Sequence, residues 1–249
     1  MSLFAGRAAL VTGAGGGIGR AVCRILARDG ARVVATDLNQ KAAEDTVSML
    51  INPDVHMALG IDVTNKTSIE SVIKSAFDKF QTPPCLIANA AGITRDNFLL
   101  QMDEQAFMDV LDVNVKGTFL VTQVATTALL EHDLTSGSIV NFSSIVGKTG
   151  NIGQCNYSAS KAAVQALTKS SALELARVGV RVNCVLPGFT NTSMVETVPE
   201  KVKNKLLKLT PLNRLAQPEE IAEVVAFLLS EKSSFMTGAC VEVTGGLAM

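Results

Sequence analysis

The chain has 249 residues, of which 47% are hydrophobic and 18% are charged, and its formal net charge is −1. This composition is typical of a globular protein and excludes an intrinsically disordered one. The balanced charge argues against binding to nucleic acid or to an anionic membrane by bulk electrostatics. No apolar run in the sequence approaches the ~18 residues of a membrane span.

The first apolar run, 8–11, begins too early to leave room for a cleavable secretory signal, and a mitochondrial transit peptide is equally hard to fit. Five widely spaced cysteines without a Cys-x-x-Cys pair predict free thiols in a reducing compartment. The two histidines, His56 and His132, are too few and too far apart for a histidine-based metal site. We expect both of them at the surface or in turns, and we predict no metal.

Short runs rich in Val, Ile and Ala alternate with longer helical patterns along the whole chain. These runs show little polar alternation, which is expected for strands that helices cover on both faces. The predicted strands are 7–12, 32–36, 55–61, 84–89, 138–143, 180–186 and 240–243, and the predicted helices are 18–28, 40–50, 66–80, 103–130, 155–177 and 218–230.

This strand–helix alternation predicts an α/β protein with a doubly wound, seven-stranded parallel sheet and helices on both faces. No linker or repeat interrupts it, so we expect a single domain over residues 1–249. The pattern breaks at about 190–211, where a short helix, 200–209, is bracketed by Pro199 and Pro211. We expect this insertion above the carboxyl edge of the sheet, where such folds bind ligands.

A glycine-rich turn, Thr12–Gly19, follows the first predicted strand and opens the first predicted helix. Glycines let the backbone approach a pyrophosphate closely, and the amino end of the helix offers it free N–H donors. Glycine also serves ordinary turns, so the turn alone is weak evidence. Its place between a strand and a helix favours a dinucleotide-binding Rossmann domain.

The second predicted strand leads to Asp37, eighteen residues after Gly19. A carboxylate at this place accepts hydrogen bonds from ribose hydroxyls and repels a 2′-phosphate. Neither Gly16 nor Leu38 offers a compensating cation, so NAD is favoured over NADP. The alternative interpretation is that Asp37 or Asn39 caps the next helix, and the two roles are compatible.

Two further polar positions each allow two interpretations. Asp62, followed by Val63, ends the third strand, where it is placed to contact adenine or else to cap the following helix. Asn114 interrupts a helix that otherwise reads as apolar. It is a candidate catalytic residue or a buried amide that satisfies backbone groups.

The segment Tyr157-Ser158-Ala159-Ser160-Lys161 holds the only tyrosine of the chain, with a lysine four residues later. Residues four apart share one face of a helix, so the phenol and the ammonium are expected to be neighbours. A nearby cation lowers the pKa of a tyrosine from about 10, which would make Tyr157 an acid/base near neutral pH. Ser144 lies thirteen residues earlier, just past a strand, and adds a hydroxyl donor.

Taken together, these residues resemble the short-chain dehydrogenase/reductase family over almost the entire chain. The family pattern is matched by Thr12–Gly19, the turn 89–92, Asn114, Ser144 and the pair Tyr157/Lys161. The turn departs from the family pattern at Ala90, which replaces a second asparagine and removes a side-chain role.

Finer motifs resemble two subgroups of this family. Segments 92–97, 150–157 and 187–189 resemble the 3-oxoacyl-carrier-protein reductases. Segments 116–123, 143–148 and 241–247 resemble animal 17β-hydroxysteroid dehydrogenases of type 8, which are also described as NAD-dependent (3R)-3-hydroxyacyl-CoA dehydrogenases. The resemblance implies NAD-dependent interconversion of 3-hydroxyacyl and 3-oxoacyl thioesters of CoA or acyl carrier protein in fatty acid metabolism. It implies the mitochondrial matrix for a eukaryotic chain and the cytoplasm otherwise.

The resemblance also implies residue roles. Tyr157 exchanges a proton with the substrate oxygen, Ser144 hydrogen-bonds that oxygen, Lys161 lowers the pKa of Tyr157 and binds ribose, and Asn114 holds a water that links Lys161 to solvent. Gln154 joins Ser144 and Tyr157 as a substrate residue. The candidate cofactor-binding residues are Gly13, Gly15, Gly16, Gly17, Ile18, Gly19, Asp37, Leu38, Asp62, Val63, Asn89, Ala90, Ala91, Tyr157, Lys161, Thr190 and Thr192.

Two helical segments, 155–177 and the second half of 103–130, carry small or apolar residues around much of their circumference. A helix that packs only on a sheet needs one apolar stripe, so the surplus favours a two-fold contact between chains. A second contact through 245–249 would give a tetramer. The resemblance implies either a homotetramer or a heterotetramer with a carbonyl reductase type 4-like subunit. The alternative is extra helix packing within one subunit.

Two other functions remain open. The apolar stretch 98–102 and the loop around Met194 suit a sterol as well as an acyl chain, so a 17β-hydroxysteroid (estradiol) dehydrogenase is one alternative. A non-catalytic NAD-binding subunit is the other, and the presence of Asn114, Ser144, Tyr157 and Lys161 together argues against it.

Overall fold

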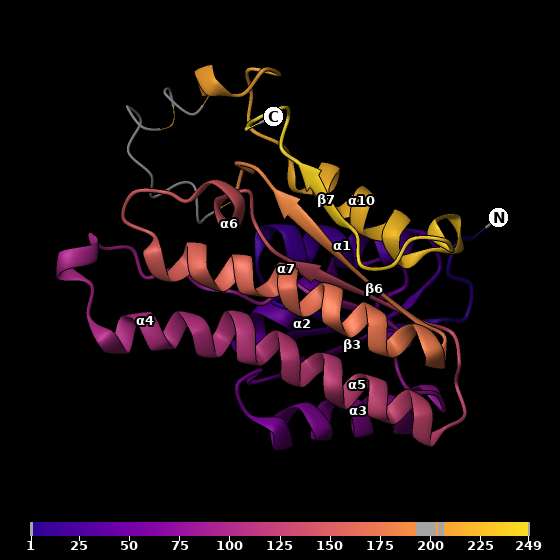
Figure 1. The fold of residues 1–249 in the computed structure, drawn as a ribbon. Coiled ribbons are helices and arrows are strands. Elements are labelled where there is room, and N and C mark those ends of the chain that lie inside the picture. The colour runs from indigo at the N-terminus through magenta and orange to yellow at the C-terminus, as the bar shows by residue number, and fades with distance from the viewer. Residues whose placement is uncertain (1, 193–202, 204–206, 249) are drawn as a thin grey trace.

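The computed structural model describes residues 2–192, 203 and 207–248. Its strands form one parallel sheet in the order β3-β2-β1-β4-β5-β6-β7 (Figure 1). All seven predicted strands, and the doubly wound sheet that they imply, are confirmed. The strands are β1 (Ala8–Thr12), β2 (Arg32–Asp37), β3 (Met57–Gly60), β4 (Leu86–Asn89), β5 (Gly137–Phe142), β6 (Val180–Pro187) and β7 (Cys240–Val243).

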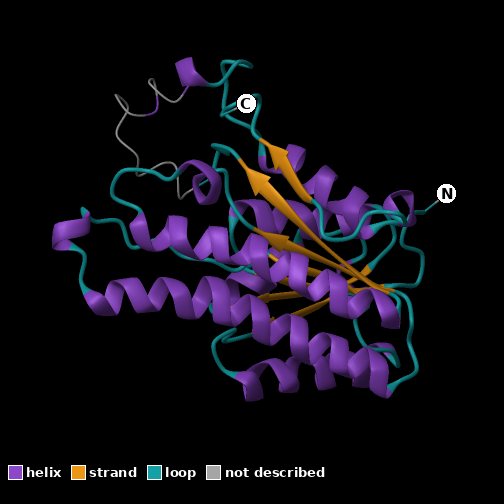
Figure 2. Ribbon diagram, viewed as in Figure 1, coloured by secondary structure: helices purple, strands orange, loops and turns teal. Residues whose placement is uncertain are grey.

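Helices cover both faces of this sheet (Figure 2). The α-helices are α1 (Gly17–Arg28), α2 (Gln40–Ser48), α3 (Lys66–Phe80), α4 (Glu104–Leu111), α5 (Thr118–Glu131), α6 (Val146–Thr149), α7 (Cys155–Leu175) and α10 (Pro218–Leu229). Short 3₁₀ turns are η1 (Pro53–Val55), η2 (Leu99–Gln101), η4 (Ala176–Val178) and η5 (Glu231–Ser233), and η3 (Asp112–Gly117) is a π-helical turn.

Three helical expectations need comment. The helix expected over 103–130 is present as one helical segment from α4 to α5, but the wider π-helical turn η3 interrupts its regular α-helical geometry. The short helix α6, just after β5, was not expected. Most of the helix expected over 200–209, and Met194 in the loop before it, lie outside the described residues.

The core forms two layers because side chains alternate across each strand. Ala9 and Val11 of β1 face one layer, which includes apolar residues of α1 and α10. Ala8 and Leu10 of β1 face the other layer, which includes apolar residues of α3 and α5. Both faces of β1 are therefore apolar, which explains why its sequence shows no polar alternation.

Buried amides and hydroxyls link the central strands to the second helix layer. Asn89 of β4 donates from Nδ2 to Thr122 Oγ1 of α5 at 3.1 Å and to Asn141 Oδ1 of β5 at 2.8 Å. Asn141 donates in turn to Thr168 Oγ1 of α7 at 2.9 Å. Hydrogen bonds of this kind hold α5 and α7 at defined positions across the sheet, because a misplaced helix would leave buried polar atoms unpaired.

His56 corrects an expectation. It is buried, whereas His132 lies exposed at the end of α5 as expected. Nδ1 of His56 accepts a hydrogen bond from Val33 N at 3.0 Å, and Nε2 lies 2.9 Å from Ile51 O. The neutral imidazole thus satisfies a backbone N–H at the start of β2, and burial lowers the pKa of His56.

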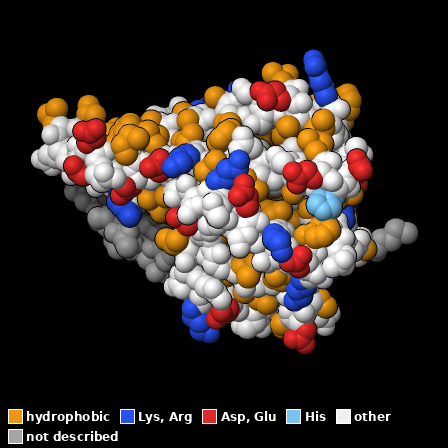
Figure 3. Space-filling view, turned by 90° about the horizontal axis from the view of Figure 1, so that it is seen from below, with side chains coloured by type: hydrophobic (Ala, Val, Ile, Leu, Met, Phe, Trp, Pro, Cys, Tyr) orange, Lys and Arg blue, Asp and Glu red, His pale blue; other side chains and the backbone are white. Residues whose placement is uncertain are grey.

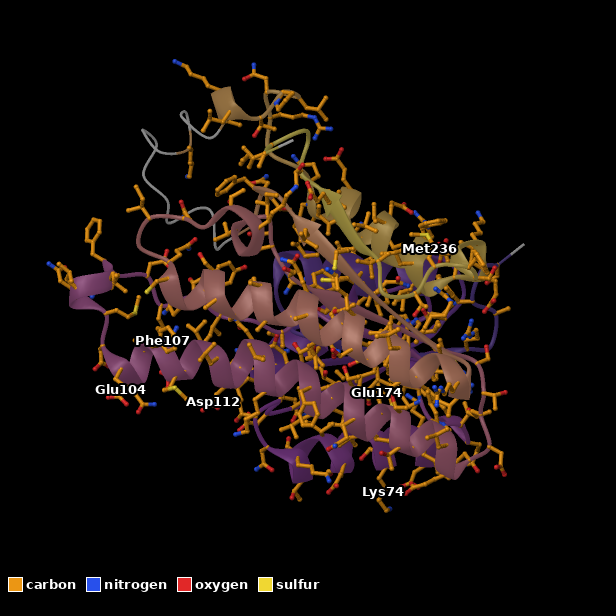
Figure 4. All side chains as sticks on the ribbon, viewed as in Figure 1. Lys74, Glu104, Phe107, Asp112, Glu174 and Met236 are labelled. Atoms are coloured by element: carbon orange, nitrogen blue, oxygen red, sulfur yellow. The ribbon has the colours of Figure 1, made fainter. Side chains whose placement is uncertain are left out.

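Charges of both signs are interspersed over the face shown in Figure 3. Lys74 of α3 and Glu104 of α4 point away from the body of the molecule (Figure 4). Among the described residues, no helix is long and apolar enough to cross a membrane. The same residues contain no group of three or more His, Cys, Asp or Glu side chains placed to hold a metal ion.

Replacing Asn141 tests the buried amide network. We predict that Asn141→Ala lowers the free energy of unfolding by about 2 to 4 kcal/mol, because it removes two buried hydrogen bonds and leaves a cavity. Urea unfolding followed by circular dichroism measures this change. The exposed Gln123→Ala on α5 is the control and should change stability by less than about 0.5 kcal/mol. Equal effects of the two substitutions would contradict a structural role for the network.

Candidate functional site

The candidate site lies where the strand order reverses between β1 and β4. The loops that follow these two strands diverge there, which opens a crevice at the carboxyl edge of the sheet. A cleft of about 350 Å³ occupies this position. Its lining consists of Gly13, Gly16, Gly17, Ile18, Gly19, Asp37, Ala90, Gly92, Thr94, Asp96, Phe142, Ser143, Ser144, Ile145, Val146, Gln154, Tyr157, Lys161, Pro187, Gly188, Phe189, Thr190 and Thr192.

A second hollow, of about 560 Å³, lies between α3 and α5 on the outside of the molecule. Its described lining includes Lys66, Glu70, Phe77 and His132, and it contains none of the residues predicted for the site. The chemistry predicted from the sequence therefore gathers in the smaller cleft.

The glycine-rich turn leaves room for a ligand at the amino end of α1. Gly13 has a φ of 65°, and a Cβ there would lie 2.8 Å from Ala91 Cα. A Cβ on Gly17 would lie 2.7 Å from Thr192 Cγ2, so Thr192 closes over the start of the helix. No side chain caps α1 at Gly16, which leaves backbone N–H groups directed at the cleft. An anionic pyrophosphate fits this position.

Asp37 lines the end of the cleft at β2. Its Oδ2 accepts a hydrogen bond from Gly15 N at 3.0 Å, and its Oδ1 accepts one from Asn39 N at 3.0 Å. The capping role falls to Asn39, whose Oδ1 accepts from Ala42 N at the start of α2. Asp37 thus joins the glycine-rich turn to β2 and keeps its charge at the cleft.

Several predicted cofactor residues lie outside the described lining. Gly15 bonds Asp37, and Ala91 N donates to Thr12 Oγ1 at 3.1 Å. The side chain of Asn89 is occupied in the buried amide network, and that of Leu38 is exposed to solvent. The exposed side chain of Leu38 is free to contact a cofactor, whereas Asn89 Nδ2 is already bonded within the protein.

Asp62 and Val63 also lie outside that lining. Asp62 Oδ1 accepts hydrogen bonds from the N and Oγ1 atoms of Thr64, at 2.9 and 2.7 Å. The interpretation of Asp62 as a helix cap is wrong, because Asn65 caps α3 through its side-chain oxygen. Asp62 instead closes the tight turn before the cap, and Val63 is buried against Gly117.

The first turns of α7 bring Tyr157 and Lys161 to the cleft beside Ser144. Ser144 and Tyr157 both line the cleft, and Ser144 Oγ accepts a hydrogen bond from Val146 N at 3.2 Å. Lys161 Nζ lies 5.5 Å from the centroid of the Tyr157 ring and donates to Phe142 O at 2.8 Å. Lys161 is only 5% exposed, so its ammonium lies behind the phenol and away from water.

The expected lowering of the pKa of Tyr157 by Lys161 is wrong. Burial of the phenol raises the pKa of Tyr157 to about 12, against the hydrogen bond from Ser144 that lowers it. Burial also lowers the pKa of Lys161 to about 8. Both shifts have one physical cause, because an apolar surrounding disfavours the charged form of each group.

The side chain of Asn114 contacts backbone and a neighbouring helix. Its Oδ1 accepts from Ile93 N at 2.8 Å, and its Nδ2 donates to Ile93 O and to Ser160 Oγ, both at 3.0 Å. Both N–H groups are therefore engaged within the protein. Asn114 instead ties the loop after β4 to α7, beside Lys161.

Gln154 lines the mouth of the cleft together with Asp96. Gln154 Nε2 donates to Asp96 Oδ2 at 2.9 Å, and Gln154 Oε1 accepts from Asn151 Nδ2 at 2.9 Å. Thr190 and Thr192 line the opposite part, where Thr190 Oγ1 donates to Gly188 O at 3.2 Å. Sequence reasoning missed Asp96, although the motif 92–97 contains it.

Comparison with known proteins agrees with this geometry. Residues 13–248 match the family model described as enoyl-(acyl carrier protein) reductase. The chain is 51% identical to (3R)-3-hydroxyacyl-CoA dehydrogenase from Rattus norvegicus, over 97% of this chain and 96% of the relative. It is 49% identical to the Homo sapiens protein of that name, over 97% of this chain and 95% of the relative.

A bacterial relative covers the chain equally well. The chain is 40% identical to 3-oxoacyl-[acyl-carrier-protein] reductase FabG from Thermotoga maritima, over 98% of each chain. Both the family model and these relatives span the glycine-rich turn, the Ser144–Tyr157–Lys161 arrangement and the carboxyl-terminal strand. The chain therefore belongs to the short-chain dehydrogenase/reductase family of nicotinamide-dependent oxidoreductases.

Proposed function

We propose that the protein is an NAD-dependent oxidoreductase that interconverts 3-hydroxyacyl and 3-oxoacyl thioesters. The observation that carries this proposal is the placement of Ser144, Tyr157 and Lys161 in the cleft that begins at the glycine-rich turn. A hydroxyl donor, a phenol and a buried ammonium at one point suit proton exchange with a carbonyl or alcohol oxygen. The relatives named for 3-hydroxyacyl and 3-oxoacyl chemistry support this substrate class.

A nicotinamide held in this cleft would supply or accept the hydride, and the residues of the chain position the substrate and move its proton. Ser144 hydrogen-bonds the substrate oxygen, and Tyr157 donates a proton to it during reduction or removes one during oxidation. Lys161 would hold the nicotinamide ribose from its place behind the phenol of Tyr157. Asn114 positions Lys161 and the loop after β4, while Gln154 contacts the acyl group near the reacting carbon.

The preference for NAD is inferred from charge. Asp37 would meet the 2′-hydroxyl of the adenosine ribose, and its carboxylate would repel a 2′-phosphate. Within the described part of the cleft, Lys161 is the only cation among the lining residues, and it lies with Tyr157 and not with Asp37. The backbone of Gly13–Gly19 would hold the pyrophosphate, and Thr190 and Thr192 would close over it.

The rim of the cleft suits a hydrocarbon tail. Phe98, Leu99, Leu100 and Ile152 are exposed, with Leu100 at 97% and Ile152 at 85%. The hydrogen bond from Asn97 N to Gly153 O, 2.9 Å long, joins the loops that carry them. An acyl chain lying on these residues would cover apolar surface at about 0.8 kcal/mol per methylene. A 17β-hydroxysteroid is the alternative substrate, and the same rim would accommodate its apolar rings.

We further propose that the single domain, residues 1–249, assembles as a homotetramer or with a carbonyl reductase type 4-like subunit. Ala159, Ala162, Ala166 and Leu173 of α7 are exposed, and Leu173 is 80% exposed. Such a stripe of small apolar residues suits a two-fold helix contact. For a eukaryotic chain we propose the mitochondrial matrix, by the resemblance described above, and otherwise the cytoplasm.

Replacing Tyr157 tests the proton transfer. We predict that Tyr157→Phe lowers kcat for reduction of acetoacetyl-CoA by NADH at least about 10²- to 10⁴-fold, because only the phenolic proton is removed. NADH binding, measured by calorimetry, should remain within about threefold of the wild type. Near-normal turnover by Tyr157→Phe would rule out the assignment. Turnover of crotonyl-CoA in place of acetoacetyl-CoA by the wild type would instead favour enoyl reduction.

Replacing Asp37 tests the cofactor preference. We predict that wild-type kcat/KM is clearly higher with NADH than with NADPH. Asp37→Ala should reduce the NADH-to-NADPH ratio of kcat/KM by at least about tenfold, because it removes the ribose contacts with NADH and the repulsion of the 2′-phosphate of NADPH. Steady-state rates with both cofactors give the ratio. Asp45→Ala on the exposed side of α2 is the matched control and should leave it unchanged. A wild type that prefers NADPH would refute the role of Asp37.

The pKa of Tyr157 sets a pH dependence. Oxidation requires the phenolate as base, whereas reduction requires the protonated phenol as acid. With a pKa raised to about 12, the phenolate fraction grows with pH across the whole assay range. We predict that kcat/KM for oxidation of 3-hydroxybutyryl-CoA rises from about pH 7 to about pH 10, while the value for reduction stays level or falls. An oxidation rate that is highest in acid would contradict this assignment.

A further inference from the structure

We propose that Asp96 sets the charge selectivity of the substrate site. It disfavours 3-oxo acids that carry a free carboxylate. The accepted class is then esters and thioesters, in which the same carboxyl group bears no charge. This inference rests on the proposed function of the cleft, and it names a property of the substrate that the cofactor and the proton-transfer residues do not decide.

The position of Asp96 is well defined by its neighbours. Its carboxylate lines the same cleft as Ser144 and Tyr157. Gln154 Nε2 donates to Asp96 Oδ2 at 2.9 Å, and Asn151 orients Gln154 through its own amide. The backbone bond between Asn97 N and Gly153 O, 2.9 Å long, holds the two loops together beside this pair. Asp96 is therefore placed at the substrate end of the cleft, on the side of Gln154.

Apart from Lys161, the cations on the neighbouring segments, Arg95 and Lys148, do not line the cleft. Arg95 Nη1 donates to Thr94 O at 3.0 Å, and Lys148 Nζ pairs with Glu242 Oε1 at 2.7 Å. Lys161 is buried behind Tyr157 and donates to Phe142 O. In the part of the cleft lining that the structure describes, Lys161 is the only cation, and Asp96 and Asp37 are the anions. An incoming carboxylate thus meets Asp96 with no lining cation placed beside it.

The chemistry of the substrate makes this charge decisive. In a 3-oxo acid the carboxylate carbon is separated from the reacting carbonyl carbon by a single methylene. When Ser144 and Tyr157 hold that carbonyl oxygen, the carboxylate must also lie inside the cleft. The pKa of Tyr157 is raised chiefly by burial, and the negative charge of Asp96 adds to this increase, so that charge already reaches the reacting hydroxyl. An ester or thioester at the same carbon has no charge and escapes the repulsion.

The test compares two substrates of almost equal size, acetoacetate and methyl acetoacetate, in reduction by NADH. The measured quantity is the ratio of kcat/KM for the acid to that for the ester. Because Asp96 is exposed and its field is screened, we expect Asp96→Asn to raise this ratio by about fivefold. Asp96→Glu keeps the charge and should keep the wild-type ratio. Asp109→Asn, which removes a carboxylate paired with Gln105 on α4, is the matched control and should not change it.

Salt provides a second measurement that needs no variant. In the wild type, the same ratio should rise as ionic strength increases from about 10 mM to about 300 mM, because the Debye length shrinks from about 30 Å to below 10 Å. The rise should disappear in Asp96→Asn. A purely structural role for Asp96 would lower both kcat/KM values together and leave their ratio and its salt dependence unchanged.

The outcomes separate this inference from the proposed function. A ratio that is the same in Asp96→Asn and in the wild type, or a wild-type ratio that does not respond to salt, overturns the role of Asp96. Reduction of acetoacetyl-CoA by the wild type is measured alongside. If acetoacetyl-CoA is not reduced while both small substrates are, the thioester proposal is overturned. The charge selectivity is then decided by the acid-to-ester ratio of kcat/KM alone.

Discussion

The burial of Lys161 is the constraint on which the rest of the site depends. A lysine that is 5% exposed needs a partner for its ammonium, and Phe142 O at the end of β5 is that partner. Space for Nζ comes from Gly92, where a Cβ would lie 3.3 Å from Nζ and 3.2 Å from Asn114 Oδ1. The ends of β4 and β5 and the first turns of α7 are thereby brought together around one charge.

Several contacts around α7 serve this arrangement. Ser143 Oγ donates to Lys161 O at 2.7 Å, and Gln165 Nε2 donates back to Ser143 Oγ at 3.1 Å. Gly147 of α6 packs so closely on α7 that a Cβ would lie 2.8 Å from Ala162 N. Helix α7 is therefore clamped to the loop after β5, which fixes how far Tyr157 stands from Ser144. Reactive groups held by packed backbone in this way lose little freedom when substrate binds.

The centre of the cleft disfavours the charged forms of its ionisable side chains. Burial raises the pKa of Tyr157 and lowers that of Lys161, so each charged form is disfavoured before a ligand arrives. Besides Lys161, the charged lining residues of the cleft are Asp37 and Asp96, which lie at its cofactor and substrate ends. We infer that a dry centre between two anionic ends favours uncharged reacting groups, and that the charged parts of the ligands must be held by backbone N–H groups or stay outside.

The seven strands and the existence of the dinucleotide turn could be read from the sequence alone, because both depend on local patterns. Apolar runs between helical periods predict parallel strands, and the glycines of Thr12–Gly19 between β1 and α1 predict a phosphate-binding turn. The spacing of Tyr157 and Lys161 placed both on one face of a helix. By contrast, the π-helical turn η3 between α4 and α5 left no trace in the periodicity, because the backbone stays helical across it while Asn114 bonds the distant residue Ile93.

Only the tertiary structure decided the properties that depend on neighbours remote in the sequence. The direction of the Tyr157 pKa shift follows from burial, which outweighs the hydrogen bond from Ser144, and no local motif reports burial. The sequence predicts Asn89 and Asp62 as cofactor residues, and the structure adds that Asn89 Nδ2 also bonds Asn141 and that Asp62 Oδ1 also bonds Thr64. Asp96 gained its place at the cleft through Gln154, fifty-eight residues away. Local patterns thus determined the elements and their order, whereas desolvation and hydrogen bonding between distant segments decided which polar groups remain free to act.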